Sequence, residues 1–250
     1  MPSPNPPRKV GLARVLSKLG YCSRGQAATL IRAGRVRLNE RVRLDPETPV
    51  RIEKDRILID DAHLATQTKI YLMMNKPRGL VTTASDEKGR DTIYSLLDQS
   101  TPWIAPVGRL DKASEGLLLM TNDSEWSAKI AAPESHLEKT YHAQIATVAD
   151  EKLTRALVSG VSTEDGDSLR ALRASLLRSG EKNSWLEIAL DEGKNRQIRR
   201  MLAARSIEVL RLIRVAIGPL QLGKLAKGAH RPLTTEEKNM LDRAILGQIS

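Results

Sequence analysis

The sequence of 250 residues contains no phenylalanine, and aromatic residues make up 3% of it. A surface on which successive nucleobases stack on aromatic rings is therefore not expected, and any core must be built from Leu, Ile, Val, Ala and Met. Cysteine is equally scarce, because Cys22 is the one residue of its kind. It allows neither an internal disulfide nor the thiolate cluster of a typical structural zinc site, so we expect a protein of the reducing cytoplasm.

Long apolar runs are also missing. The first residues, MPSPNPPRKV, lack the apolar core of a signal peptide, and no run approaches the roughly 20 residues that cross a bilayer. We find no Gly-rich phosphate-binding fingerprint, no cluster of metal-ligating residues and no recognisable Ser-His-Asp order, and the four histidines are scattered. We therefore predict a cytoplasmic protein that needs no membrane, no metal and no cofactor.

Positive charge, in contrast, is abundant and uneven. The formal net charge is +10, and a hydrophobic content of 40% suffices for the core of one large or two ordinary domains. Residues 8–56 contain 13 Lys and Arg against five Asp and Glu. Because this short stretch carries most of the net charge, we predict a separate basic module whose partner is a polyanion, with nucleic acid as the first candidate.

Two short helices and a hairpin are predicted within the basic stretch. Apolar residues at helical spacing end at Gly20, and Ser23 with Gln26 forms a capping-box pair for a second helix that ends at Gly34. Apolar and basic residues then alternate over 36–44, which predicts two strands with one apolar and one basic face.

This arrangement resembles the small RNA-binding domain shared with ribosomal protein S-four. Many relatives have Gly where this chain has Glu40, and because Glu tolerates a positive φ poorly, we expect a differently built turn here. The resemblance implies an RNA-binding surface, and an ordinary solvated face is the alternative. The candidate RNA contacts are Arg24, Arg32, Arg35, Arg37 and Arg41.

A polar stretch without a clear period, residues 59–68, is predicted to be a linker. The domain organisation that follows has a flexible tail over 1–7, the basic domain over 8–58, and a second, larger domain over 69–250.

The second domain begins with KIYLMMNKPRGLVTT, which predicts a strand, a turn and another strand, because Pro77 and Gly79 interrupt the apolar runs. Lys76 lies at this turn and is a candidate contact to the substrate. An ordinary turn lysine and a lysine that binds a phosphate fit the sequence equally well.

Three further motifs combine charged and apolar residues. GRLD, at 108–111, lies between two apolar segments and, taken alone, fits a surface hairpin equally well. KTY, at 139–141, opens an alternating strand, and GKNRQIRRM, at 193–201, predicts a loop and a helix start with Asn195 as N-cap. Cations crowd this helix end, whose dipole is already positive, so we expect a phosphate or a carboxylate nearby, with a structural ion pair as the alternative. These cations are Lys194, Arg196, Arg199 and Arg200, of which Arg196 is a candidate substrate contact.

In this order and spacing, the three motifs resemble the ribosomal RNA pseudouridine synthases. The basic module and the NKPRG turn narrow the resemblance to the RsuA-like family, over residues 8–247. It implies an α+β fold in which a catalytic domain with a largely antiparallel mixed sheet follows the S-four-like module. It also implies the isomerisation of a specific uridine in ribosomal RNA, in which uracil leaves its ribose, turns and is rejoined through carbon five, without redox cofactor or water. We expect a monomer that acts on ribosomal RNA or on a subunit assembly intermediate.

The resemblance suggests roles for four residues, and the role of a fifth, Arg109, is a separate hypothesis that follows from its place beside the carboxylate. Asp111 is the catalytic carboxylate, and whether it acts as nucleophile or as base toward the ribose stays open. Arg199 is the guanidinium that keeps the carboxylate ionised. Tyr141 packs against the uracil or assists proton transfer, and Leu212 forms an apolar floor, with plain core packing as its alternative. Arg109 fills the space that the target base vacates when it is extruded from a stem.

Two other functions compete with this interpretation. A non-catalytic ribosome-binding or assembly protein with the same fold would explain the basic module, but it leaves Asp111, Tyr141 and Arg199 in family positions without a reason. A hydrolytic enzyme acting on RNA or a nucleoside needs a second acid or base and an activated water, and no carboxylate pair in the sequence points to one.

Overall fold

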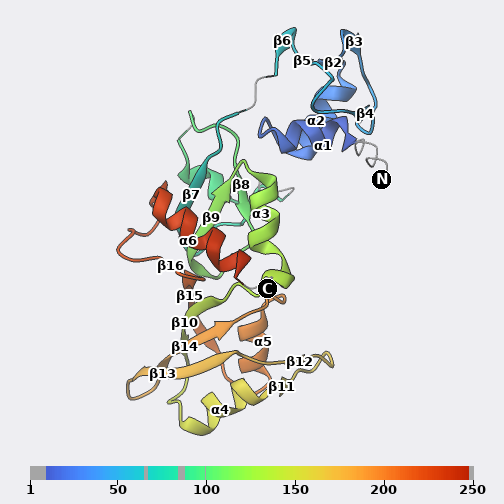
Figure 1. The fold of residues 1–250 in the computed structure, drawn as a ribbon. Coiled ribbons are helices and arrows are strands. Elements are labelled where there is room, and N and C mark those ends of the chain that lie inside the picture. Colours follow the sequence, from blue (N-terminus) through green and yellow to red (C-terminus); the bar gives the residue numbers. More distant parts are fainter. Residues whose placement is uncertain (1–9, 65–66, 84–87, 99, 248–250) are drawn as a thin grey trace, which may run out of the picture. The chain divides into compact units, whose positions relative to one another are not determined.

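The computed structural model describes residues 10–64, 67–83, 88–98 and 100–247 as an α+β protein (Figure 1). The described residues up to Tyr71, together with Ser100–Ala105 and Thr121–Trp126, form one compact unit, and the remaining described residues form a second. The first unit contains the basic module, and the second contains most of a larger mixed sheet.

The two helices predicted in the basic module are confirmed as α1 (Leu12–Lys18) and α2 (Arg24–Arg32). The capping box is complete, because Gln26 N donates to Ser23 Oγ at 3.1 Å and Ser23 N donates to Gln26 Oε1 at 3.0 Å. These two bonds satisfy backbone donors that the first turn of a helix otherwise leaves unpaired. Fully buried apolar side chains then join both helices to the strands that follow, and they include Leu12, Leu16, Ala27, Ile31 and Val36.

The basic hairpin belongs to a four-stranded sheet of order β3-β2-β5-β6. Its strands are β2 (Val36–Leu38), β3 (Arg41–Val42), β5 (Ile57–Ile59) and β6 (Ala62–His63), while β1 (Val10–Gly11) pairs separately with β4 (Pro49–Val50).

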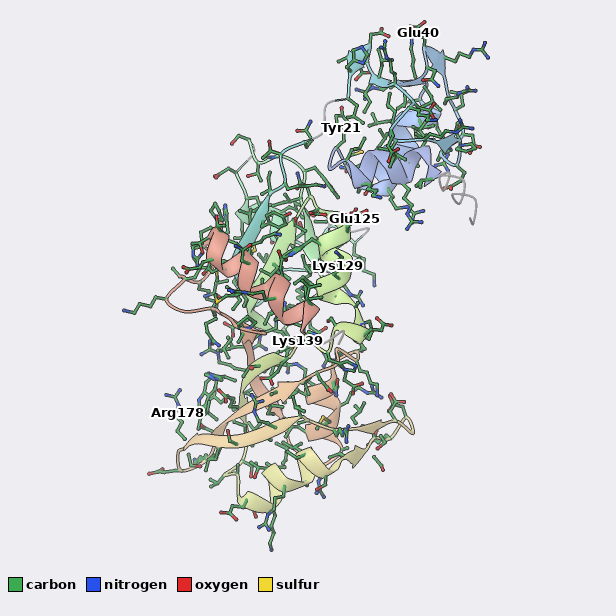
Figure 2. All side chains as sticks on the ribbon, in the orientation of Figure 1. Tyr21, Glu40, Glu125, Lys129, Lys139 and Arg178 are labelled. Carbon is green, nitrogen blue, oxygen red and sulfur yellow. The ribbon has the colours of Figure 1, made fainter. Side chains whose placement is uncertain are left out.

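The turn between β2 and β3 differs from our expectation. Asn39 and Glu40 both have left-handed backbones, with φ of 50° and 67°, as a tight hairpin turn requires. Glu40 is labelled in Figure 2. Glu40 thus takes a left-handed conformation that favours glycine. Asn39 supports the turn, because its side chain donates to Asp55 and accepts from Arg56 N.

The stretch predicted to be a linker contains β6. Asp60 and Asp61 form a second turn with positive φ, so the sheet continues to His63 before residues 65–66, which lie outside the described part of the chain. Residues 1–7, predicted to be a flexible tail, also lie outside it. The division of the chain into domains after residue 58 stays a prediction.

The larger sheet runs in the order β13-β14-β10-β15-β9-β7-β17, with β8 paired to β9 and β16 paired to β15. Its strands are β7 (Tyr71–Lys76), β8 (Ala105–Val107), β9 (Glu115–Thr121), β10 (Lys139–Ile145), β13 (Arg173–Ser179), β14 (Ser184–Leu190), β15 (Val209–Ile217), β16 (Leu220–Gln221) and β17 (His230–Pro232). Strands β10, β13, β14 and β15 pair antiparallel, whereas β9 and β15 pair in parallel. The expected mixed, largely antiparallel sheet is therefore confirmed. The second strand predicted after the NKPRG turn is reduced to an isolated bridge between Val81 and Thr92, because residues 77–80 do not return alongside β7.

The remaining elements pack around this sheet. They are η1 (Ile93–Leu96), α3 (Ser124–Ala131), η2 (Pro133–Ser135), α4 (Glu151–Ser159), the pair β11 (Val161–Ser162) and β12 (Ser168–Leu169), α5 (Gln197–Ala203) and α6 (Thr235–Leu246). Alternate side chains of β10, β14 and β15 form one core with Leu157 of α4 and Met201 of α5, both of which are fully buried. This core fixes one face of the strands, so residues at their ends are held in place beside it.

Candidate active site

The GRLD motif forms a loop between β8 and β9. Gly108 begins it with φ of +69°, a conformation that favours glycine. Thr82 holds Leu110 from the side, donating its hydroxyl to the Leu110 carbonyl at 2.7 Å, while Leu110 N donates back to Thr82 Oγ1 at 3.3 Å. Ser114 N donates to the Asp111 carbonyl at 3.0 Å and closes the loop. The charged residues that interrupt the apolar strands thus lie on a loop between the paired strands β8 and β9, and these hydrogen bonds fix the loop.

Lys76 lies beneath this loop. Its side chain is 0% exposed, and Nζ donates to the carbonyls of Asp111 at 3.1 Å, Ser114 at 2.9 Å and Pro77 at 3.1 Å. Burial lowers the pKa of Lys76 to about 8, although the charges of Asp111 and Glu115 act in the opposite direction. The interpretation of Lys76 as a phosphate contact is therefore wrong, because all three of its donors are used inside the protein.

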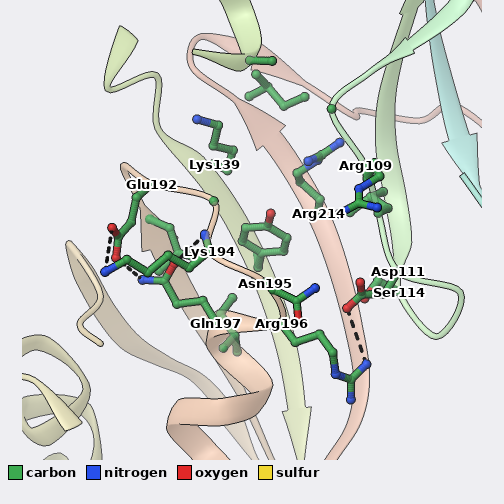
Figure 3. Close-up of a pocket in the computed structure, with 18 of the residues that line it drawn as sticks. Arg109, Asp111, Ser114, Lys139, Glu192, Lys194, Asn195, Arg196, Gln197 and Arg214 are labelled. Carbon is green, nitrogen blue, oxygen red and sulfur yellow. Dashed lines mark hydrogen bonds and ion pairs between the residues drawn. The ribbon is translucent and has the colours of Figure 1, made fainter. Parts of the chain in front are cut away.

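A cavity of about 520 Å³ opens beside the loop, and the predicted residues Arg109, Asp111, Tyr141, Arg196 and Leu212 all line it (Figure 3). This volume lies in the range of small-ligand pockets. Tyr141 and Leu212 belong to the paired strands β10 and β15, and Leu212 is 6% exposed, so it faces the cavity and also packs in the core. Packing in the core is thus observed for Leu212, and its role as the apolar floor of a substrate site stays a prediction.

The carboxylate of Asp111 forms an ion pair with Arg196, at 3.6 Å between Oδ2 and Nη1 (Figure 3). The prediction had given this place to Arg199. The difference arises at the start of α5, where Arg196, and not Asn195, is the N-cap residue, with φ of 50° and ψ of 31°. Because of this left-handed backbone, Arg196 lies outside the helix, which begins at Gln197. The side chain of Arg196 lies on the cavity side.

Arg199 instead joins α5 and β15 to the underside of the loop. It donates to the carbonyls of Val209 at 3.0 Å and Ala113 at 3.1 Å, while its Nε is buried without a partner among the described residues. Burial lowers the pKa of Arg199, the charge of Arg196 lowers it further, and Asp111 opposes both. Arg199 therefore acts on Asp111 through the backbone and through its field, without a direct ion pair.

The loop that precedes α5 is held by Gln197, which is 2% exposed. Its Nε2 donates to Glu192 at 2.8 Å and to the carbonyl of Arg170 at 3.0 Å, and its Oε1 accepts from Lys194 N at 3.3 Å. Lys194 in turn forms an ion pair with Glu192 at 3.2 Å. Most of the charges that crowd this helix start are thus compensated by carboxylates of the protein.

Sequence analysis missed two cations in the cavity wall, Lys139 and Arg214. Arg214 is 5% exposed and lies in RLIRVAIG, where a charge between apolar residues of a strand was the available signal. Lys139 is part of the KTY motif, but the resemblance suggested a role only for the tyrosine of that motif.

The arginines predicted to bind RNA are all exposed on the basic module. Two of them are paired with acids: Arg35 with Asp60, by bonds of 2.8 and 2.5 Å, and Arg37 with Asp61 at 3.3 Å. The bond from Arg35 lowers the pKa of Asp60. No ion pair involves Arg24, Arg32 or Arg41 within the described residues, so these three keep an unmatched charge.

Two absences apply to the part of the chain that the structure describes. It contains no helix long and apolar enough to cross a membrane, and no group of three or more His, Cys, Asp or Glu arranged to hold a metal ion.

Comparison with known proteins identifies the family of the chain. A family model described as RNA pseudouridylate synthase matches residues 70–204, and a model described as S4 domain matches residues 10–57. An uncharacterized RNA pseudouridine synthase of Aquifex aeolicus is 36% identical over 242 residues, which cover 95% of each chain. Ribosomal large subunit pseudouridine synthase B of Bacillus subtilis is 34% identical over 92% of this chain and 94% of its own. A crystal structure of a pseudouridylate synthase has a TM-score of 0.66 at 30% identity and covers 93% of this chain and 99% of that one.

The family model covers more than half of the chain, and relatives above 30% identity span nearly all of it. With its S4 domain in front of the catalytic sheet, the chain belongs to the RNA pseudouridine synthases, intramolecular isomerases that convert uridine in RNA to pseudouridine.

Proposed function

We propose that this enzyme isomerises a uridine in ribosomal RNA of the large subunit, with Asp111 as its catalytic carboxylate. The target class is supported by the relative of Bacillus subtilis, whose name describes a ribosomal large subunit pseudouridine synthase. The exposed and unpaired arginines of the S4 domain supply the positive surface that a folded RNA requires. One observation carries the assignment of Asp111: its carboxylate is the one that lines the cavity together with Tyr141 and Leu212 and pairs with an arginine there.

The reaction breaks the bond between N1 of uracil and C1′ of the ribose and forms a bond between C5 and C1′. The proton on C5 leaves to solvent and N1 gains one, so the product is an isomer and no electrons are gained or lost. Asp111 acts on the ribose, as a nucleophile at C1′ or as a base on a neighbouring hydrogen. Arg196 pairs with this carboxylate at 3.6 Å and holds it at the cavity wall in either route.

The other lining residues bind and turn the base. Tyr141 and Leu212 offer an aromatic ring and an apolar surface to the uracil ring, which has to stay in the cavity while it is detached. Arg109 is exposed at the rim of the same cavity, so it can enter the space that the extruded base leaves in the RNA.

Mapping pseudouridines in ribosomal RNA with and without the protein tests the proposed target. Cells that lack the protein should lose pseudouridine at one or a few large-subunit positions, and purified protein should restore it on RNA from these cells. Unchanged ribosomal RNA in the deleted cells would contradict the proposed target. Two alternatives have their own signatures: release of free uracil indicates a hydrolase, and tight RNA binding without any product indicates a non-catalytic binding protein.

A further inference from the structure

The charges that line the active-site cavity do not balance. Five cationic side chains and two carboxylates line it, which leaves a formal charge of +3. Lys194 is matched by Glu192 and Arg196 by Asp111. The three cations without a carboxylate within ion-pair distance, among the described residues, are Arg109, Lys139 and Arg214. Figure 3 shows these three above the ion pair of Asp111 and Arg196.

Arg214 lies in the middle of the long central strand β15 and is 5% exposed. Its Nε donates to the Leu117 carbonyl at 2.7 Å, whereas its Nη2 is buried without a partner within the described residues. A buried guanidinium with an unused donor is costly unless an anion compensates its charge. The backbone of Arg214 is held in place by Gly116 of β9. The two backbones are so close that a Cβ added to Gly116 would lie 2.3 Å from the carbonyl oxygen of Arg214.

Lys139 adds a second unmatched charge next to the first. Burial lowers the pKa of Lys139, and the positive charge of Arg214 lowers it further, while Asp191 acts in the opposite direction. Arg214 is also the register partner of Tyr141 across β10 and β15, and Lys139 precedes Tyr141 by two residues on the same face of β10. Both cations therefore flank the tyrosine that, in our proposed function, contacts the uracil.

A target nucleotide enters the cavity together with its backbone, so a phosphate accompanies the base. Guanidinium and ammonium donors bind phosphate with charge-assisted hydrogen bonds, which are stronger than hydrogen bonds between neutral groups. We propose that Lys139 and Arg214 form a phosphate subsite, which binds one of the two backbone phosphates that flank the target uridine. This subsite rests on the proposed function, because it assigns the anion to the same RNA substrate.

The subsite predicts a particular salt dependence. Lys139→Met should weaken binding to a large-subunit rRNA fragment about tenfold at fixed salt. It should also reduce the slope of log K against log salt by about 0.7 to 0.9, since one phosphate contact is lost. The side chain of Lys139 has no hydrogen bond or ion pair within the described residues, so the variant should keep the unfolding temperature of the wild type. Lys194→Met is the matched control, because that lysine lines the same cavity but is paired with Glu192.

Equal slopes for the wild type and Lys139→Met would overturn the subsite. Arg214→Met is a second variant, and its salt slope should also be reduced. Its slope is used only if its unfolding temperature shows that the protein is folded. If it is not folded, Lys139→Met alone tests the subsite. A methylphosphonate placed on either side of the converted uridine identifies the phosphate: it should weaken binding by the wild type but add nothing in Lys139→Met. If a methylphosphonate on either side of the uridine weakened binding by Lys139→Met as much as binding by the wild type, this would also contradict the proposal. If the slopes differ but no uridine of the fragment is converted, the proposed function fails, and the assignment of the phosphate to a target uridine fails with it. If a uridine is converted and the slopes are equal, the subsite alone fails.

Discussion

At the scale of single residues, two arginines that are three positions apart on α5 and its N-cap have different duties. Arg196 reaches Asp111 from the cavity side, whereas Arg199 is used by two backbone carbonyls. Their order in the motif gave no means of telling them apart, because the choice depends on where the helix begins. The left-handed backbone of Arg196 decides it, and such a conformation is rare for a residue with a long side chain.

Arg196→Met and Arg199→Met should therefore fail in different ways. Arg196→Met removes the ion-pair partner of an accessible carboxylate, so we expect kcat to fall at least about tenfold with little change in stability. Arg199→Met leaves the carbonyls of Val209 and Ala113 without a donor, so it should lower the free energy of unfolding by about 1–3 kcal/mol. Release of the C5 hydrogen from labelled uridine measures kcat, and urea unfolding measures stability. An Arg196→Met enzyme with normal kcat would refute this division of roles.

At the scale of elements, the helix ends were the most predictable parts of the chain. The capping box predicted for Ser23 with Gln26 forms with both of its hydrogen bonds, and the structure has a second complete box, Thr234 with Glu237. The two residues of a capping box are three positions apart, so a short stretch of sequence is enough to predict it. Lys76 shows the opposite case, because its burial under the catalytic loop depends on a strand-to-loop contact that its neighbours in sequence do not reveal.

The cap of α6 makes a prediction about acid stability. Glu237 also forms a bidentate pair with Arg231, with bonds of 2.7 and 2.6 Å, and this lowers the pKa of Glu237 from 4.5 to about 2. The carboxylate therefore stabilises the fold fully above pH 4.5, and the stabilisation is lost as the pH falls toward 2. Glu237→Gln keeps the capping geometry but loses the charge, so it should cost about 1–2 kcal/mol at pH 7 and progressively less between pH 4.5 and 2.

Urea unfolding of both proteins at several pH values checks this. Glu236→Gln is the control, because Glu236 is exposed in the same helical turn and has no ion pair within the described residues. A Glu237→Gln penalty that does not change with pH would show that the pair with Arg231 carries no net stabilisation.

At the scale of the whole molecule, the sequence indicated the two parts of the chain and the residues of the cavity better than it indicated the sheet. The charge asymmetry alone predicted a basic module, and the comparison identifies it as an S4 domain. Strand periodicity located β10, but it carries no information on which strands pair. The order of the sheet and the parallel contact of β9 with β15 came from the family resemblance and from the structure.

The sheet explains why residues from distant motifs meet. β10 lies between β14 and β15, and the parallel pairing of Glu115 with Ile213 and Gly116 with Arg214 brings the GRLD loop to the same sheet edge. Motifs about 30 and 80 residues apart in sequence thus line one cavity, as the consequence of strand order rather than of local pattern.

The central claim is that Asp111 carries out the isomerisation, and Asp111→Asn tests it most directly. The substitution removes the charge and keeps the size, and it leaves the carbonyl of residue 111 available to Lys76. We expect RNA affinity within about twofold of the wild type and no release of the C5 hydrogen, while Asp98→Asn, an exposed carboxylate outside the cavity, stays fully active. Pseudouridine formed by Asp111→Asn at the wild-type rate would contradict the account.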